Sequence, residues 1–354
     1  MARDPTHRPR WALARQSTRR WVAAFLTSAM LLAVAINVVP PTLLLAARSL
    51  MFSKFVADHA IDEGRLNDAL STDGVVVTDP WRYRQFVDPQ LYGQLSHFAE
   101  LHKGDGTALA REILLRMSPG RPMAGCGAES LGEKVAMVAR RRGCCSDYAA
   151  AFQLYAGALG LPARGVETQL HSTNEYFDRL TGNWVWVDAM YRTQATDKKG
   201  QLLSHYQVRE HLLEHQSIHI IELSDAPIAP KTYQILFDPA HYAIAYWYPV
   251  TDVVAADEFD GRLRRFHVMR PIRQLVAYLL GVRVNPMGLA SPSIVHRLRI
   301  ESRIAWIALT LVAISQLLLA LVVATRCLKL VQELLARWVT KTRTGTVTSV
   351  EESE

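Results

Sequence analysis

The stretch "RGCCSDYAAAF", Arg142 to Phe152, places two adjacent cysteines where a helix is expected to begin. Upstream, residues 131–142 ("LGEKVAMVARRR") have the pattern of an amphipathic helix that Gly143 would end. Downstream, "SDYAAAFQLYAGALG" continues with small and apolar residues at helical period and closes on helix-terminating residues. The first unpaired amides of a helix favour an anion, so a thiol at this position gains thiolate character.

The hydrophobic period changes from helical to strand-like beyond this helix. Residues 164–171 ("RGVETQLH") and 183–190 ("NWVWVDAM") are rich in β-branched and aromatic residues, with turn chemistry between them. Further candidate strands are residues 217–223, 232–237 and 243–250. A cysteine-bearing helix packed on an antiparallel sheet predicts an α+β domain.

A nucleophilic thiol needs a base within reach and a third group that orients the base. His171 ends one predicted strand and Asp188 lies near the end of the next. The two side chains are therefore predicted to be cross-strand neighbours that face the start of the helix.

Four motifs occur in order over about 46 residues: "GCCSDYA" (143–149), "LGLPAR" (159–164), a His171-to-Glu175 spacing, and "NWVWVD" ending at Asp188. In this pattern the chain resembles the transglutaminase-like superfamily. The resemblance implies a papain-like fold and a triad of Cys145 as nucleophile, His171 as base and Asp188 as orienter.

The resemblance further implies attack on an amide or ester carbonyl, followed by transfer of the acyl group to water or to an amine. Both outcomes stay open. Thr173 stands where an aromatic residue is common in the family, and Ala189 where a proline is usual. No cofactor is implied, and no acidic cluster suggests the calcium site of the animal enzymes.

Other polar residues have structural interpretations. Cys144 would point about 100° away from Cys145 on a helix and serve packing, or pair with Cys126 or Cys145 in an oxidising compartment. Asp147 is expected to cap or orient the helix start, and Glu175 to serve structure. Four histidines recur at short intervals, but a solvated helix face explains them better than a metal site: His205, His211, His215 and His219.

Two uncharged apolar segments, 21–47 and 304–325, are each long enough to cross a bilayer. A cleaved signal peptide is the alternative for the first, but its apolar run continues well past the small-residue site at 33–35. The chain after the second apolar segment has apolar residues at positions 328, 331, 335 and 338, which is helical spacing. This pattern suits a helix that lies along the membrane surface or a juxtamembrane helix that packs against protein.

The net charge of +7 collects at the two ends of the chain, so a nucleic-acid-binding surface is not indicated. By the positive-inside rule both termini are cytoplasmic, in a two-pass protein of a bacterial inner membrane. The predicted organisation is a basic tail (1–20), a first transmembrane helix (21–47), an extracytoplasmic domain (48–300, core about 108–250), a second transmembrane helix (304–325) and a juxtamembrane helix with tail (326–354).

These observations predict a membrane-tethered, transglutaminase-like cysteine enzyme of the cell envelope. Its expected partners are the lipid bilayer, an envelope peptide, peptidoglycan or polysaccharide substrate, and other membrane proteins of envelope or exopolysaccharide biogenesis. The alternative is a catalytically inactive version of the fold that acts as a binding or assembly subunit, which the departures at Thr173 and Ala189 keep open.

Overall fold

The computed structural model describes residues 20–25, 27, 54–70, 79–118, 128–224, 229–231, 233–249, 252–265 and 287–347. The chain divides into two compact units. One is Phe52–Leu298, and the other combines Met1–Met51 with Arg299–Glu354. The first unit holds the sheet and the predicted site.

An eight-stranded sheet has the order β1-β8-β7-β2-β3-β4-β5-β6. The pairing is antiparallel except between β1 and β8, which run parallel. The strands are β1 (Lys54–Ala57), β2 (Ala163–Thr168), β3 (Ser172–Asp178), β4 (Asn183–Asp188), β5 (Thr193–Thr196), β6 (His219–Glu222), β7 (Ile244–Trp247) and β8 (Met287–Ala290). The predicted α+β class is confirmed, with a mixed rather than a purely antiparallel sheet.

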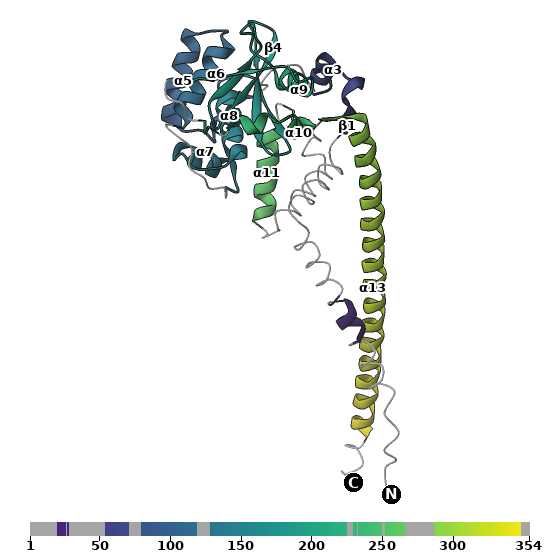
Figure 1. The fold of residues 1–354 in the computed structure, drawn as a ribbon. Coiled ribbons are helices and arrows are strands. Elements are labelled where there is room, and N and C mark those ends of the chain that lie inside the picture. Colours follow the sequence, from purple (N-terminus) through teal and green to yellow (C-terminus); the bar gives the residue numbers. More distant parts are fainter. Residues whose placement is uncertain are drawn as a thin grey trace. The chain divides into compact units, whose positions relative to one another are not determined.

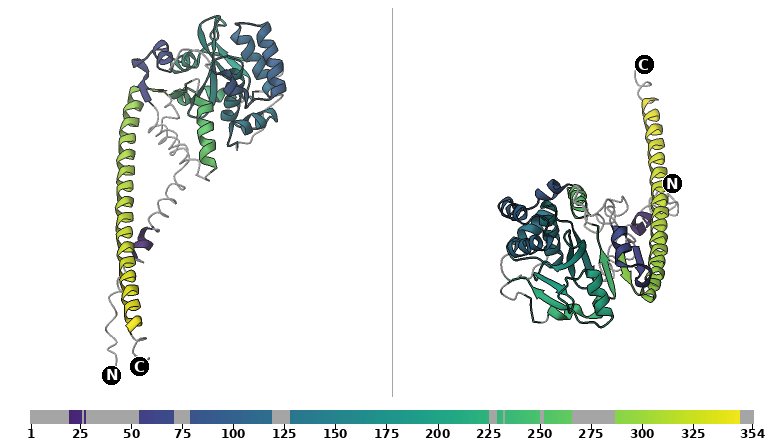
Figure 2. Two further views of the ribbon diagram at one scale, coloured as in Figure 1. Left: turned by 180° about the vertical axis from the view of Figure 1, so that it is seen from behind. Right: turned by 90° about the horizontal axis from the view of Figure 1, so that it is seen from above.

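Helices α4 to α8 pack on one face of this sheet, and α3, α9 and α10 pack on the other. The helices among the described residues are α3 (Glu63–Leu70), α4 (Pro80–Arg84), α5 (Pro89–Leu101), α6 (Gly106–Met117), α7 (Leu131–Ala139), α8 (Cys145–Ala158), α9 (His205–Leu213), α10 (Pro239–Tyr242), α11 (Asp252–Arg264) and α13 (Pro292–Val347), with 3₁₀ turns η1 (Asp58–Ala60) and η2 (Tyr233–Phe237). The blue helices α5 and α6 gather on one side of the teal strands (Figure 1), and both views in Figure 2 agree.

Successive side chains along a strand point to opposite faces of the sheet, so the hydrophobic core consists of two clusters. Val185 and Val187 of β4 pack with α4 to α8 in one cluster, whereas Trp186 between them packs with α3, α9 and α10 in the other. This is the period of two expected of a strand that is buried on both faces.

Helix α8 lies at the centre of the larger core. Eleven of its side chains, from Asp147 to Ala158, are buried, and the Asn174 Nδ2 of β3 donates to the Ala149 carbonyl at 3.1 Å. A Cβ at Gly157 would lie 2.5 Å from the Tyr83 ring of α4, so only glycine allows this approach. These contacts hold α8 against β3 and against α4.

Two local predictions were wrong. Residues 233–237, which fall in the strand predicted at 232–237, form η2. Helix α7 ends at Ala139 rather than at Arg142, because Arg141 takes a left-handed backbone conformation with φ of 61°.

Among the described residues, one helix is long and apolar enough to cross a membrane. Its apolar stretch, Ile314–Ala336, lies within α13 and overlaps the predicted span 304–325. It begins at Ile314 rather than at 304 and ends at Ala336 rather than at 325. Helix α13 runs without interruption through this stretch. Most of the first predicted span, 21–47, falls outside the described residues.

Candidate active site

Cys145 is the first residue of α8, as predicted, and its side chain is partly exposed. Gly143, two residues earlier, has φ of 111°, and a Cβ there would lie 3.1 Å from the Asp147 Cβ. Only glycine accommodates this turn without strain. The sharp entry into α8 sets the direction in which the Cys145 thiol leaves the helix.

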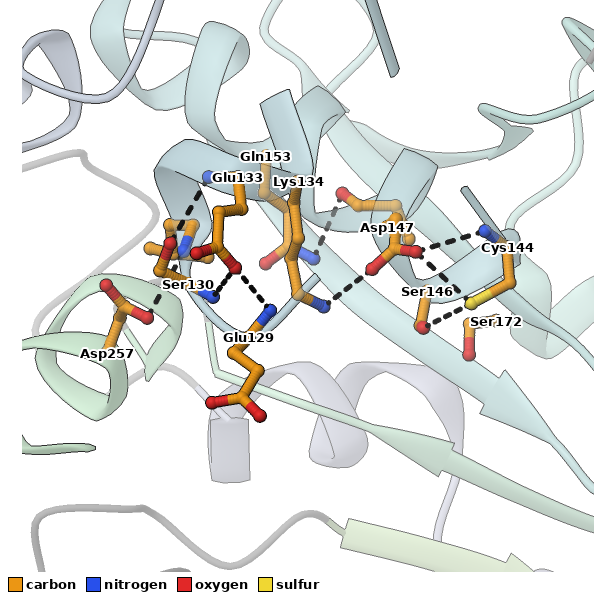
Figure 3. A network of polar contacts seen from close by, with 12 residues as sticks. Glu129, Ser130, Glu133, Lys134, Cys144, Ser146, Asp147, Gln153, Ser172 and Asp257 are labelled. Carbon is orange, nitrogen blue, oxygen red and sulfur yellow. Dashed lines mark hydrogen bonds and ion pairs between the residues drawn. The ribbon is translucent and has the colours of Figure 1, made fainter. Parts of the chain in front are cut away.

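A network of polar contacts holds the start of α8 (Figure 3). Asp147 is buried, and its Oδ2 accepts hydrogen bonds from the Cys144 backbone N at 3.1 Å and the Cys144 Sγ at 3.3 Å. Its Oδ1 lies 3.1 Å from the Lys134 Nζ of α7. The predicted capping by Asp147 is confirmed, and Lys134 neutralises the buried carboxylate.

Cys144 does not occupy the helical position that the sequence predicted for it. It is the residue that caps α8, with extended backbone angles of −104° and 177°, and its thiol is directed to Asp147 and Ser146 rather than into an apolar core. No disulfide joins Cys144 to Cys145. The alternative partner, Cys126, lies outside the described residues.

The structure brings His171 and Asp188 together. His171 immediately precedes β3, Asp188 ends β4, and the antiparallel register pairs Asn174 with Val187. The His171 Nε2 lies 2.6 Å from the Asp188 Oδ2. The predicted contact of His171 with Asp188 is present, and it leaves the imidazole Nδ1 for the thiol. The strands that carry it differ from the prediction: His171 does not end the strand predicted at 164–171 but precedes β3, which was not predicted and lies between β2 and β4.

Asp188 is fully buried and satisfied on both oxygens. Oδ2 also accepts from the Tyr233 hydroxyl at 2.6 Å, and Oδ1 accepts from the Met190 and Tyr191 backbone amides at 2.9 and 3.2 Å. Burial alone would raise the pKa of Asp188, but the charge and hydrogen bond of His171, with the Tyr233 hydrogen bond, bring this pKa below its ordinary value. The carboxylate therefore stays ionised and holds the imidazole in place.

Cys145 and His171 share a hydrogen bond that shifts the pKa of both groups. Burial opposes ionisation of the thiol, yet the hydrogen bond and charge of His171, followed by contacts with Ser172, lower the pKa of Cys145. Burial also opposes protonation of His171, yet Asp188 and then Cys145 raise the pKa of His171 to about 10. At neutral pH the geometry favours a thiolate next to an imidazolium.

This arrangement predicts a distinctive pH dependence. The rate of Cys145 alkylation by iodoacetamide should rise at a lower pH than that of a free thiol, because His171 lowers the pKa of Cys145, and should step again near pH 10 as His171 loses its proton. Site-resolved mass spectrometry of alkylation at several pH values measures this. A single step at the pKa of a free thiol would contradict the ion pair.

Two residues near the site serve structure. Thr173, where the family resemblance led us to expect an aromatic residue, is buried, and its Oγ1 accepts from the Trp186 Nε1 at 3.0 Å. Glu175 is fully buried, forms an ion pair with Arg164 at 2.6 Å, and accepts from the His205 backbone N at 2.6 Å. The structural role expected for Glu175 is confirmed.

The recurring histidines do not share one face. His205 is fully buried and stacks on Tyr242, so the solvated face predicted for it was wrong; burial and the charge of Arg209 lower the pKa of His205 to about 3. His215 and His219 are exposed. Within the described part of the chain, no group of three or more histidine, cysteine or acidic side chains could hold a metal ion.

Sequence reasoning missed several residues that contact the triad. Tyr233 lies 45 residues from its partner Asp188 in the chain and was assigned to a strand. Tyr191, whose ring centroid lies 6.1 Å from that of His171, packs edge-on against Tyr233. Of the residues that contact the triad, only Ser172 could have been found from the sequence, because it directly follows His171.

Comparisons with known proteins assign this chain to no family. No family model, no curated protein and no solved structure matches it.

Proposed function

We propose that the chain is a membrane-tethered, transglutaminase-like cysteine enzyme that hydrolyses or transfers acyl groups. The observation that carries this proposal is the continuous contact from Cys145 through His171 to Asp188, with a thiol of lowered pKa at one end and a buried carboxylate at the other. A nucleophile, a base and a group that orients the base are the parts that acyl transfer by cysteine requires.

In the proposed reaction, the Cys145 thiolate attacks the carbonyl carbon of an amide or ester. A C–S bond forms, and the negative charge that develops on the carbonyl oxygen is stabilised by backbone amides at the start of α8. The C–N or C–O bond then breaks, and the His171 imidazolium gives its proton to the leaving group.

The thioester on Cys145 is resolved in a second step. Neutral His171 takes a proton from water or from an amine, which attacks the thioester carbonyl and releases the thiolate. Water yields hydrolysis and an amine yields transamidation. Asp188 keeps its charge throughout and stabilises the imidazolium each time it forms.

The proposed setting is an extracytoplasmic face of a bacterial inner membrane. The apolar stretch of α13 supports membrane association, and the basic residues at both ends of the chain support cytoplasmic termini. In this topology, the substrate is an amide or ester of an envelope peptide, peptidoglycan or polysaccharide. The sequence motifs, rather than any match to a known protein, support the transglutaminase-like assignment.

Trapping the acyl-enzyme tests the proposal. The purified full chain, incubated with p-nitrophenyl acetate at pH 7, should show a burst of nitrophenolate and an acetyl group on Cys145, detected by mass spectrometry of its peptide. The Cys145→Ser variant should lose both signals. If acetyl appears on Cys145 no faster than on N-acetylcysteine in the same solution, the chain is better explained as an inactive binding or assembly subunit.

A further inference from the structure

The Tyr233 hydroxyl shares one oxygen of Asp188 with the imidazole of His171. It lies 2.6 Å from Oδ2, the same oxygen that stands 2.6 Å from the His171 Nε2. An ionised carboxylate can only accept hydrogen bonds, so Tyr233 donates its proton to Asp188. Burial and the charge of Asp188 raise the pKa of Tyr233 well above its ordinary value, so the hydroxyl keeps the proton that it donates.

Thr193 holds the Tyr233 hydroxyl from the other side. The Thr193 Oγ1 lies 3.0 Å from the Tyr233 Oη, and both side chains are buried. Because the single proton of the Tyr233 hydroxyl goes to Asp188, the Thr193 hydroxyl is the donor in this contact. A chain of hydrogen bonds therefore runs from Thr193 through Tyr233 and Asp188 to His171, and each bond in such a chain strengthens the next.

The Tyr233 ring is held by packing. Its centroid lies 4.6 Å from that of Tyr191 and 5.4 Å from that of Phe237, and both contacts are edge-on. The Tyr233 backbone N donates to the Pro230 carbonyl at 2.8 Å, at the start of η2. These contacts do not involve the hydroxyl, so a phenylalanine ring should occupy the same place.

The Asp188 carboxylate also has anchors besides Tyr233. Its Oδ1 accepts from the Met190 and Tyr191 backbone amides at 2.9 and 3.2 Å, which fixes the plane of the carboxylate. Loss of the Tyr233 hydroxyl would therefore change the charge on Oδ2 rather than the position of the carboxylate. The charge on Oδ2 is what attracts the proton of His171.

We infer that Tyr233 is a positioning residue of the proposed triad, which takes up part of the charge on the Asp188 Oδ2 and thereby lets His171 release its proton. The inference rests on the proposed function and adds a residue of η2 to the site. In the second step of the proposed reaction, neutral His171 takes a proton from water or from an amine. Without the Tyr233 donor, Oδ2 would hold the imidazolium more tightly and leave less neutral imidazole for this step.

Two ionisable side chains of neighbouring helices also interact with the Asp188–His171 pair. They are His205 of α9 and Tyr242 of α10. Burial lowers the pKa of His205 to about 3 and raises that of Tyr242, so both are neutral at pH 7. Cys145 of α8 carries no charge once it is acylated. The pH dependence of the second step therefore reports the balance between Asp188 and His171.

Hydrolysis of p-nitrophenyl acetate by the purified full chain separates the two steps. Nitrophenolate leaves without a proton, so the burst reports attack by Cys145, and the steady state reports hydrolysis of the thioester with His171 as base. In Tyr233→Phe the burst should match that of the parent, whereas the steady-state rate at pH 7 should fall roughly ten-fold. The midpoint of this rate against pH should move upward, because His171 keeps its proton to higher pH.

The direction of the pH shift distinguishes this role from support of the fold. If Tyr233 only filled space, its loss would let water reach Asp188 and weaken the attraction of the carboxylate for His171. The midpoint would then move downward, towards the ordinary pKa of histidine. A downward shift in Tyr233→Phe would therefore overturn the inference.

Tyr242→Phe is the matched control. It removes a hydroxyl from the same aromatic cluster, since Phe237 packs against both tyrosines, and its steady-state rate should match the parent. Thr193→Val keeps the Tyr233 hydroxyl but removes its donor, so it should slow the second step less, and it serves as the test if Tyr233→Phe fails to fold. Rates in Tyr233→Phe and Thr193→Val equal to that of Tyr242→Phe, with the burst intact, would overturn the role of Tyr233 alone. Absence of a burst in the parent would overturn the proposed function and this inference with it.

Discussion

His171→Ala should slow alkylation of Cys145 at pH 6 by about 100-fold or more. Without His171, burial raises the pKa of Cys145 and only the contacts with Ser172 oppose it, so far less of the thiol is ionised at pH 6 than in the parent. The higher intrinsic reactivity of a more basic thiolate recovers only part of that loss. The measurement is the iodoacetamide rate at Cys145, resolved by mass spectrometry.

His219→Ala is the control for this comparison, since His219 is exposed on β6 and lies outside the candidate site. Its rate should match the parent. Equal rates in His171→Ala and His219→Ala would mean that Cys145 is not activated by His171.

Arg164→Ala should lower the free energy of unfolding by about 3–5 kcal/mol. Arg164 is buried, and its Nε and Nη2 lie 2.7 and 2.6 Å from the Glu175 Oε2, while its guanidinium carbon stands 3.9 Å from the centre of the Trp184 ring. Removing the guanidinium leaves the fully buried Glu175 carboxylate without its cation. Urea unfolding followed by tryptophan fluorescence gives the difference.

The chain offers an exposed pair of the same chemistry for comparison. Arg82 and Glu258 lie 2.7 Å apart, but their side chains are 45 and 38% exposed. Arg82→Ala should therefore cost no more than about 1 kcal/mol. A loss in Arg164→Ala as small as that in Arg82→Ala would show that the buried pair contributes little to the sheet.

The helix and strands that carry the triad were predictable because their signals are local. The glycine before the cysteines, the small residues of α8 and the period of two in β4 each depend on neighbours in sequence. The contact of His171 with Asp188 was predicted, but for strands at 164–171 and 183–190; the structure inserts β3, which the sequence analysis missed, and pairs β3 with β4.

Contacts made across long stretches of chain left no such signal. Tyr233 reaches Asp188 from a 3₁₀ turn whose apolar residues look like a strand, and β1 pairs with β8 although more than 200 residues separate them. His205 appeared to lie on a polar helix face because its neighbours in sequence are polar, but Tyr242 and Trp247 enclose it. Burial by distant elements decided each of these cases.

The most direct test of the central claim compares Cys145 with a free thiol in the same solution. At pH 6, Cys145 should react with iodoacetamide well ahead of N-acetylcysteine. Access alone would favour the free thiol, so faster reaction at the partly buried Cys145 requires a thiolate. If Cys145 instead reacts at the rate of N-acetylcysteine or more slowly, it is not the ionised nucleophile of a cysteine enzyme.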